Sequence, residues 1–357
     1  MQAIDLKRYG LDLHLQQVSC RYEGLFLARV CQQHRTLYRV IGQEGEIDAV
    51  VSGRLSYQSK DAAGFPVVGD WVMVDRTDDK SGHAIIHHVL SRKSLLQRKA
   101  AGTSQAVQPL AANIDIVFVC MSLNADFNLR RLERYLAIAW DSGATPVVLL
   151  TKADLCSDVT AHVEQVSQVS IGTDVVICSN TEAEGYQEVL PHLAEGKTMA
   201  FIGSSGVGKS TLINHLMGQD ILTTKEVRKD GKGRHATTYR QLLLLPQGGV
   251  VIDTPGMREL QLNSGDLSKS FSEIETLSSQ CQFRNCSHTS EPGCAVIDAI
   301  ATGELTKERL HSFHKLQKEL SYQGLDSRQL EHEKIKNMFG GKGEMKQAMK
   351  YLKKGKK

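Results

Sequence analysis

A glycine-rich loop near the middle of the chain has the residue types and spacing of a phosphate-binding site. The pattern G-x-x-x-x-G-K-[ST] occurs at 203–210, between a predicted strand at 199–202 and a predicted helix at 211–217. Glycines let backbone N–H groups wrap phosphate oxygens, the lysine reaches the outer phosphates, and the serine hydroxyl can ligate Mg²⁺. This setting favours a nucleotide site over a chance glycine turn. Its predicted residues are Gly203, Ser204, Ser205, Gly206, Val207, Gly208, Lys209, Ser210 and Thr211.

A second motif, D-T-P-G at 253–256, directly follows the apolar run 250–252. This order predicts that Asp253 lies at the carboxyl end of a strand, where it can hold the Mg²⁺ shell, and that the Gly256 N–H can sense a γ-phosphate. Taken alone, the four residues could form an ordinary turn. Beside the phosphate-binding loop, they are better interpreted as a nucleotide switch, with Ser210 and Asp253 as Mg²⁺ ligands.

A third motif, T-K-A-D at 151–154, follows the apolar run 146–150. The carboxylate of Asp154 could accept two hydrogen bonds from guanine N1–H and its amine, which adenine cannot offer. Thr151 and Lys152 complete the motif, with threonine where N-K-x-D motifs have asparagine. Ser179 follows the run 175–178 and is a candidate for a contact to the base, although a purely structural role is almost equally well supported. The expected nucleotide is therefore GTP.

A GTPase also needs a group that orients the attacking water. The residue after Gly256 is Met257, and a thioether cannot orient water. His235 lies in the glycine-containing segment 231–238, which resembles a first switch that orders around the γ-phosphate. A solvated loop histidine is supported equally well by the motif alone. Thr237 or Thr238 would supply a further Mg²⁺ ligand, and the sequence does not choose between them.

Three of the eight cysteines lie close together with a histidine. The spacing C-x₄-C-x-H-x₅-C offers four ligands in fourteen residues, enough to close a tetrahedral zinc site, and closed sites are structural. The alternative is three buried thiols beside a surface histidine. The other five cysteines are scattered along the chain, which argues against a disulfide framework. The predicted ligands of one structural Zn²⁺ are Cys281, Cys286, His288 and Cys294.

The elements that must position these residues change along the chain. Short β-rich runs separated by turns fill 24–90 and predict a small barrel, of the oligonucleotide-binding type or another five-stranded kind. From 114 to 253, buried-looking strands alternate with amphipathic helices, which predicts a parallel α/β sheet. After about 260 we expect helices. The α/β strands are predicted at 114–122, 146–150, 175–179, 199–203, 239–245 and 250–253.

Charge and hydropathy limit the partners. A net charge of +3 over 357 residues means that any nucleic-acid contact must depend on local clusters. Residues 330–357 hold nine lysines against three glutamates, a pattern of RNA-backbone contact or of a solvated tail. Arg98, Lys99 and the barrel offer a second RNA face, with Trp71 and Tyr57 as stacking or core residues. No uncharged apolar stretch of about 18 residues occurs, so we expect a cytoplasmic protein without membrane contact, and a monomer.

The order of the motifs is unusual, because the base-reading motif precedes the phosphate-binding loop. Sheet topology tolerates such a permutation, since ligands bind at strand carboxyl ends. The chain resembles the circularly permuted GTPases of the RsgA family (also called YjeQ or EngC), which assist late maturation of the bacterial small ribosomal subunit. The resemblance runs nearly end to end. Besides the cysteine/histidine cluster, it rests on residues 111–115, 151–154, 203–210, 233–238 and 253–260.

The resemblance implies an α/β P-loop GTPase with an N-terminal OB-like barrel and a C-terminal helical zinc domain. We expect domains at 1–100, 101–262 and 263–357, binding of GTP or GDP with Mg²⁺ and one Zn²⁺, and the small (30S) ribosomal subunit with its rRNA as partner. It also favours His235 as the catalytic residue. The predicted function is ribosome-dependent GTP hydrolysis. The alternative is a nucleotide-gated placeholder in which hydrolysis only times release, and an ATP-using kinase is disfavoured by Asp154.

Overall fold

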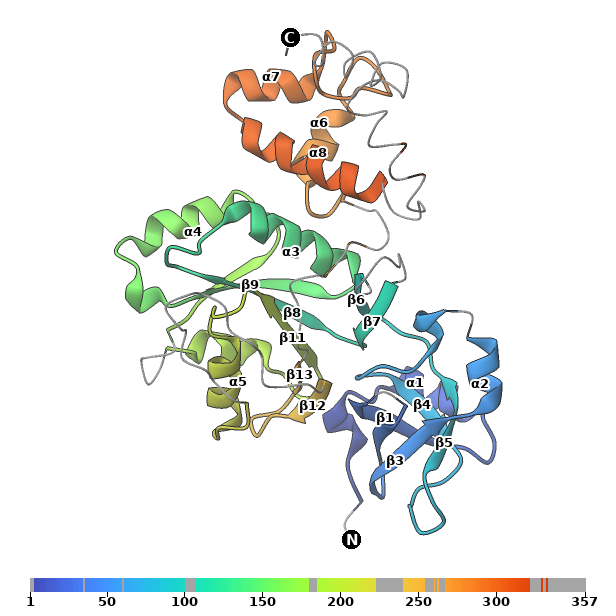
Figure 1. Cartoon of the computed structure of the whole chain (residues 1–357). Coiled ribbons are helices and arrows are strands. Elements are labelled where there is room, and N and C mark those ends of the chain that lie inside the picture. Colours follow the sequence, from blue (N-terminus) through green and yellow to red (C-terminus); the bar gives the residue numbers. More distant parts are fainter. Residues whose placement is uncertain are drawn as a thin grey trace, which may run out of the picture. The chain divides into compact units, whose positions relative to one another are not determined.

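The computed structural model describes residues 3–34, 36–59, 61–99, 107–179, 185–222, 240–253, 260, 262, 267–321, 329 and 332. The chain divides into two compact units (Figure 1). The first contains Met1–Ala100 and Ala106–Gln280, and the second contains Ala101–Gln105 and Cys281–Lys357. Among the helices that the structure describes, none is both long and apolar enough to cross a bilayer.

The N-terminal part of the first unit is a closed five-stranded barrel, as predicted. The strands follow the order β1-β2-β3-β5-β4, and β4 pairs back onto β1 to close the ring. Its interior is filled by small and β-branched side chains such as Val30, Val40 and Ile86. Such an order suits an OB-type barrel. The strands are β1 (Phe26–Gln33), β2 (Tyr38–Gly42), β3 (Gly45–Val51), β4 (Trp71–Val74) and β5 (Ala84–Val89).

Short helices pack around the barrel, and the burial of Trp71 and Tyr57 distinguishes a core residue from a surface residue. Asp12 and Ser52 cap α1 (Leu13–Ser19) and α2 (Gly53–Gln58) through their side-chain oxygens. Trp71 is 1% exposed and packs in a second small core with Leu6, so it is a core residue. Tyr57 on α2 is 92% exposed and remains available to stack on a base. The 3₁₀ turns η1 (Leu6–Tyr9) and η2 (Ala62–Gly64) complete this region.

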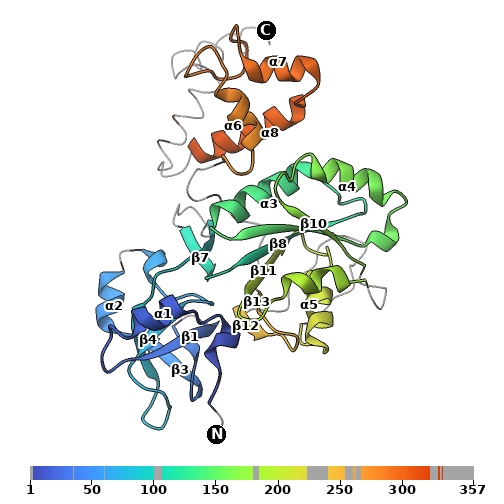
Figure 2. The same cartoon turned by 180° about the vertical axis from the view of Figure 1, so that it is seen from behind.

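The rest of the first unit is the predicted parallel α/β sheet. Five strands run parallel in the order β10-β9-β8-β11-β13, and β12 pairs antiparallel with β13. Figures 1 and 2 show α3 and α4 on one face of this sheet and α5 on the other. The strands are β8 (Ile116–Ser122), β9 (Thr145–Thr151), β10 (Asp174–Ile177), β11 (Thr198–Gly203), β12 (Arg240–Leu244) and β13 (Val250–Asp253). The helices are α3 (Leu129–Asp141), η3 (Ala153–Leu155), α4 (Val159–Ser167), η4 (Gln187–His192), α5 (Lys209–Met217) and α6 (Ser272–Ser278).

Strand β12 also joins the α/β sheet to the barrel, which the sequence did not predict. Gln33 of β1 pairs with Arg240 of β12, so the two parts share one eleven-stranded sheet. Beside this junction Arg29 is fully buried, and it donates from Nη2 to Thr198 Oγ1 at 2.9 Å and from Nε to the Gly69 carbonyl at 3.1 Å. These bonds satisfy a buried guanidinium. The hairpin of β6 (Leu95–Lys99) and β7 (Val107–Ala112) lies outside this sheet.

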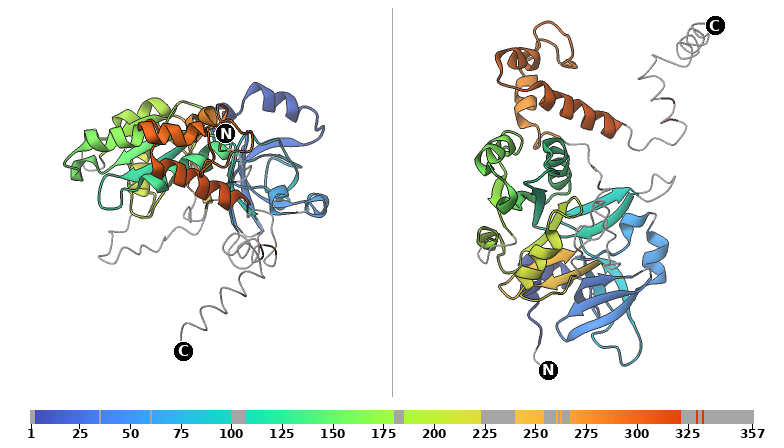
Figure 3. Two further views of the ribbon diagram at one scale, coloured as in Figure 1. Left: turned by 90° about the horizontal axis from the view of Figure 1, so that it is seen from above. Right: turned by 60° about the vertical axis from the view of Figure 1, so that its left-hand side comes forward.

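The described part of the second unit consists of a cysteine/histidine cluster followed by two helices. Cys294 is the N-cap of α7 (Ala295–Thr302), and α8 (Lys307–Ser321) follows after a turn. Leu310, Phe313 and Leu316 form the buried face of α8, the red-orange helix in both views of Figure 3. This helical content agrees with the expectation for the C-terminal region.

Candidate nucleotide site and metal centre

The predicted nucleotide residues gather at one edge of the parallel sheet. Thr151, Gly203 and Asp253 are the last residues of β9, β11 and β13, and Ser122 ends β8 between the first two. Ligands in open parallel sheets bind at strand carboxyl ends. Motifs separated by about a hundred residues are therefore neighbours, in spite of their permuted order.

The phosphate-binding loop between β11 and α5 depends on its glycines. Gly203 and Gly208 have φ angles of 147° and 100°, in a region that favours glycine. A Cβ on Gly203 would also lie 2.5 Å from the Cys120 carbonyl oxygen, so the loop could not pass β8 with a larger residue. Helix α5 begins at Lys209, so its N-terminus faces the loop and favours an anion there.

Lys209 and Asp253 provide the charges expected for a nucleotide with Mg²⁺. Lys209 Nζ donates to the carbonyls of Gly203 at 2.8 Å and Ser204 at 2.7 Å, which holds the ammonium at the loop. Burial raises the pKa of Asp253, and the positive charge of Lys209 opposes this effect. A carboxylate in such a position is stabilised by a cation. Asp253, with Ser210 in the first turn of α5, therefore suits an oxygen-liganded Mg²⁺.

The residues predicted to read the base also come together. Ser179 Oγ donates to Asp154 Oδ1 at 2.7 Å, which joins two loops that are 25 residues apart. Thr151 is fully buried, and its hydroxyl donates to the Val207 carbonyl of the phosphate-binding loop at 2.6 Å. The Thr151 hydroxyl therefore holds the phosphate-binding loop from inside the protein. Lys152 has a left-handed φ of 60° and leads into η3, which carries Asp154.

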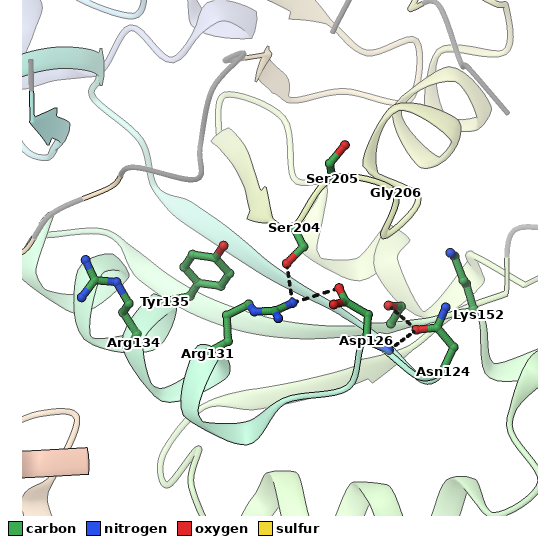
Figure 4. Close-up of a pocket in the computed structure, with 10 residues that line it drawn as sticks. Asn124, Asp126, Arg131, Arg134, Tyr135, Lys152, Ser204, Ser205 and Gly206 are labelled. Atoms are coloured by element: carbon green, nitrogen blue, oxygen red, sulfur yellow. Dashed lines mark hydrogen bonds and ion pairs between the residues drawn. The ribbon is translucent and has the colours of Figure 1, made fainter. Parts of the chain in front are cut away.

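A cavity of about 590 Å³ lies between the phosphate-binding loop and α3 (Figure 4). The sequence identified Lys152, Ser204, Ser205 and Gly206 in its lining. It missed the residues contributed by the end of β8, by the loop that follows it and by α3, which carry no motif. Their one signal was their position after a predicted strand of the sheet. These are Ser122, Asn124, Asp126, Arg131, Arg134 and Tyr135.

Several predicted residues lie outside the described part of the chain. They are Gly256, His235, Thr237 and Thr238. The nucleotide site is thus described for the phosphate-binding loop, the base-reading loops and Asp253.

The four predicted zinc ligands form one cluster in the second unit. Their ligand atoms all lie within 4.8 Å of one another. His288 Nδ1 is 3.4 Å from Cys294 Sγ, and Cys281 Sγ is 3.9 Å from the same sulfur. Three thiols and one imidazole at this spacing fit a closed tetrahedral Zn²⁺ site. Cys286 completes the set.

The turn that carries His288 is ordered by a carboxylate. Glu291 accepts hydrogen bonds from the backbone N–H groups of Ser287, Thr289 and Ser290 at 2.9 to 3.1 Å. The Ser287 hydroxyl also donates to Glu291, and this bond, followed by the backbone bonds, keeps the pKa of Glu291 well below its usual range. They stabilise a turn in which His288 has a φ of 56°, a left-handed conformation that is uncommon for histidine.

Comparison with known proteins decides the family. The model of the RsgA GTPase family matches residues 89–263. The chain is 54% identical to the small ribosomal subunit biogenesis GTPase RsgA 2 of Lactiplantibacillus plantarum, over 96% of this chain and 97% of that protein. The chain belongs to the RsgA GTPase family. An RsgA protein of Methanosarcina acetivorans is 42% identical over 92% of the chain.

Solved structures agree with membership of the RsgA family. The crystal structure of YjeQ from Thermotoga maritima has a TM-score of 0.62 and 27% identity, covering 83% of this chain and 98% of that one. YloQ, described as a circularly permuted GTPase, has a TM-score of 0.60 and 25% identity, covering 84% and 96%. The predicted circularly permuted GTPase fold is confirmed. An ABC transporter model also matches residues 186–351, a range that includes the same phosphate-binding loop.

Replacing Asp154 with asparagine should change the base preference of this RsgA-family protein. The asparagine amide would place a donor against the guanine donors, but it could donate to the 2-oxo group of xanthine. We expect KM for GTP to rise roughly 100-fold, with xanthosine triphosphate becoming the better substrate. Asp158→Asn is the matched control, since Asp158 caps α4 and asparagine caps helices equally well. An Asp154→Asn protein that still prefers GTP would remove Asp154 from base recognition.

Proposed function

We propose that this RsgA-family protein hydrolyses GTP to GDP and phosphate while bound to the small ribosomal subunit and its rRNA, and that it assists late maturation of the subunit. The observation that carries the proposal is the convergence of the phosphate-binding loop, Asp253 and the Asp154–Ser179 pair at one sheet edge. The same chain is 54% identical to a relative named for small ribosomal subunit biogenesis. The alternative, a nucleotide-gated RNA-binding placeholder in which hydrolysis only times release, is not favoured, because the relatives are named as small ribosomal subunit biogenesis GTPases.

Each residue of the proposed GTP site has a role that suits its charge or its hydrogen-bonding groups. Lys209 and the N–H groups from Gly203 to Thr211 would hold the phosphates, and Asp154 with Ser179 would read guanine. Ser210 and Asp253 would hold Mg²⁺, with Thr237 or Thr238 as a further ligand. The metal, when bound, would neutralise charge on the β- and γ-phosphate oxygens. Thr151 and Lys152 would keep the base loop against the phosphate loop, through the Thr151–Val207 bond.

The proposed water-orienting residue is His235, and Gly256 would contact the γ-phosphate. This assignment rests on the composition of 231–238 and on Met257, which cannot orient water. If the small subunit places His235 at the attacking water, hydrolysis should be slow for the protein alone and fast on the subunit.

We further propose three working parts, with an RNA-binding barrel at 1–100, the GTPase at 101–262 and a zinc-stabilised RNA-binding region at 263–357. One face of α8 supports the last of these. Lys307, His311, Lys315 and Lys318 are exposed and recur at helical spacing, opposite the buried apolar face. A row of basic side chains on a helix, three of them lysines, suits the phosphates of an RNA backbone. We propose a monomeric, cytoplasmic protein.

Loss of charge on α8 should weaken binding to the small subunit. For Lys315→Gln/Lys318→Gln, co-sedimentation with small subunits should show a slope of log affinity against log salt that is smaller by about two, because each lysine releases about one counterion. Glu308→Gln on the same helix is the control and should leave that slope unchanged. An unchanged slope in the double variant would rule out α8 as an RNA contact.

A further inference from the structure

The second residue of the phosphate-binding loop, Ser204, is held from two sides. Its carbonyl oxygen accepts a hydrogen bond from Lys209 Nζ at 2.7 Å, within the loop itself. Its hydroxyl oxygen accepts another from Arg131 Nη1 at 2.7 Å, although Arg131 precedes it by 73 residues. Figure 4 shows the Arg131 guanidinium reaching from α3 to this hydroxyl. The loop is therefore fastened to a helix outside the motif.

Arg131 is itself fixed by polar groups at the start of α3. Its Nη1 lies 2.9 Å from Asp126 Oδ2, and its backbone N–H donates to the N-cap residue Asn128 at 3.0 Å. The Asp126 N–H donates to Asn124 Oδ1 at 3.0 Å, and Ser122 Oγ donates to the same oxygen at 2.9 Å. A polar chain thus runs from the end of β8 through Arg131 to the phosphate-binding loop (Figure 4).

We propose that Arg131 is a positioning residue that sets the affinity for nucleotide phosphates through its hydrogen bond to Ser204. This inference rests on the proposed nucleotide site. The N–H groups of Ser205 and Gly206 follow Ser204 directly, and they must point at the phosphates in a loop of this type. A rotation of Ser204 would turn the peptide planes that carry them. Arg131 prevents that rotation from outside the loop.

A guanidinium suits this task better than other side chains. Hydrogen bonds from a charged donor are about twice as strong as those between neutral groups. The guanidinium group is also planar and rigid, so Arg131 Nη1 can donate one hydrogen to Asp126 and the other to Ser204 at a fixed angle. Lysine keeps the charge without the planar fork, so Arg131→Lys should restore only part of the effect.

Loss of the Arg131–Ser204 hydrogen bond should not affect the side chains proposed to read the base. Asp154 and Ser179 bond to each other in loops that follow β9 and β10, whereas the Arg131 guanidinium bonds to Ser204 and Asp126. Loss of the Arg131–Ser204 bond should therefore weaken GTP and ATP binding by the same factor. The ratio of the two affinities should remain that of the wild type, whereas general damage to the site would change it.

The test is a double-mutant cycle on nucleotide affinity in the full-length protein. Dissociation constants for fluorescent GTP, GDP and ATP analogues are measured for wild type, Arg131→Ala, Ser204→Ala and the double variant. Each single change should weaken GTP binding roughly tenfold, and the double variant should be no weaker than Arg131→Ala. The ³¹P resonances of bound GDP should shift similarly in both single variants.

Arg134→Ala is the matched control on the same helix. Arg134 lies three residues further along α3, and its Nη2 donates to the Leu260 carbonyl at 3.0 Å. Its effect on affinity should simply add to that of Ser204→Ala. The cycle therefore separates a specific brace on the loop from a general loosening of α3.

Two results would overturn the proposal. One is independent effects of Arg131→Ala and Ser204→Ala that multiply in the double variant. The other is a lower melting temperature of Arg131→Ala with unchanged nucleotide affinity, which would give Arg131 a structural role only. If Arg131→Ala does not fold, Ser204→Ala removes the same bond without disturbing the Asp126 pair, and unchanged affinity there would be equally decisive. A wild-type protein that binds no nucleotide would instead refute the proposed function.

Discussion

Replacing Lys209 with alanine should lower kcat/KM for GTP by about 10²- to 10³-fold, the loss typical for one preorganised donor to a developing negative charge. The Lys209 ammonium is held on the carbonyls of Gly203 and Ser204, where the outer phosphates are expected. Its charge also opposes the pKa increase of the buried Asp253. Alanine would remove both effects, so we expect weaker nucleotide binding together with slower chemistry.

Single-turnover hydrolysis with Mg²⁺ and excess enzyme measures this loss directly. Lys197→Ala is the control, because Lys197 lies before β11, at the opposite end of that strand from the phosphate-binding loop, and its side chain pairs on the surface with Asp115. The control should hydrolyse GTP at the wild-type rate. A Lys209→Ala protein within about twofold of wild type would show that the loop does not bind the reacting phosphates.

Replacing Cys294 with serine should abolish zinc binding and unfold the described part of the second unit. Cys294 is 2% exposed, lies beside Cys281 and His288, and is the N-cap residue of α7, so the substitution removes one of the four predicted ligands next to that helix. Structural zinc contributes roughly 10 to 16 kcal/mol in small zinc-binding peptides, more than a short helical segment gains from its core. We expect rapid proteolysis after about residue 280.

Metal analysis of the purified protein should find one zinc per wild-type chain and almost none in Cys294→Ser. Cys20→Ser is the matched control, since Cys20 is exposed on the barrel and far from the cluster in sequence. It should retain the metal and resist proteolysis. Full zinc content in Cys294→Ser, or an unchanged proteolysis pattern after chelation, would contradict a structural zinc site.

Much of the architecture could be predicted because its signals are local. The strand, loop and helix around Lys209 are contiguous in sequence, and the ligand spacing from Cys281 to Cys294 spans only fourteen residues. The predictions of β8, β9 and β11 were correct because parallel strands buried on both faces are continuous apolar runs. Short β-rich runs separated by turns correctly predicted a small barrel in the N-terminal part.

The contacts that escaped prediction join distant residues without any pattern. Arg29 bonds to Thr198, and Arg131 bonds to Ser204, across 169 and 73 residues. The pairing of β1 with β12 likewise depends on the folded arrangement of two parts. Thr151 shows the limit of a motif, because only the structure shows that its hydroxyl bonds to the Val207 carbonyl. Trp71 and Tyr57 were indistinguishable as aromatic residues until their burial was known.

The role proposed for His235 can be tested through the stimulation of GTP hydrolysis by the small subunit. If His235 orients the attacking water when the subunit orders its loop, His235→Ala should lose the stimulated part of the rate. A stimulated rate equal to wild type would exclude that role.

The central claim is tested most directly by GTP hydrolysis of the purified protein alone, with small ribosomal subunits, and with large subunits, using ATP as the control nucleotide. We predict slow hydrolysis by the protein alone, strong stimulation by small subunits only, and little turnover of ATP. Equal rates with and without small subunits would leave a GTPase of the RsgA family but would contradict a function on the small subunit.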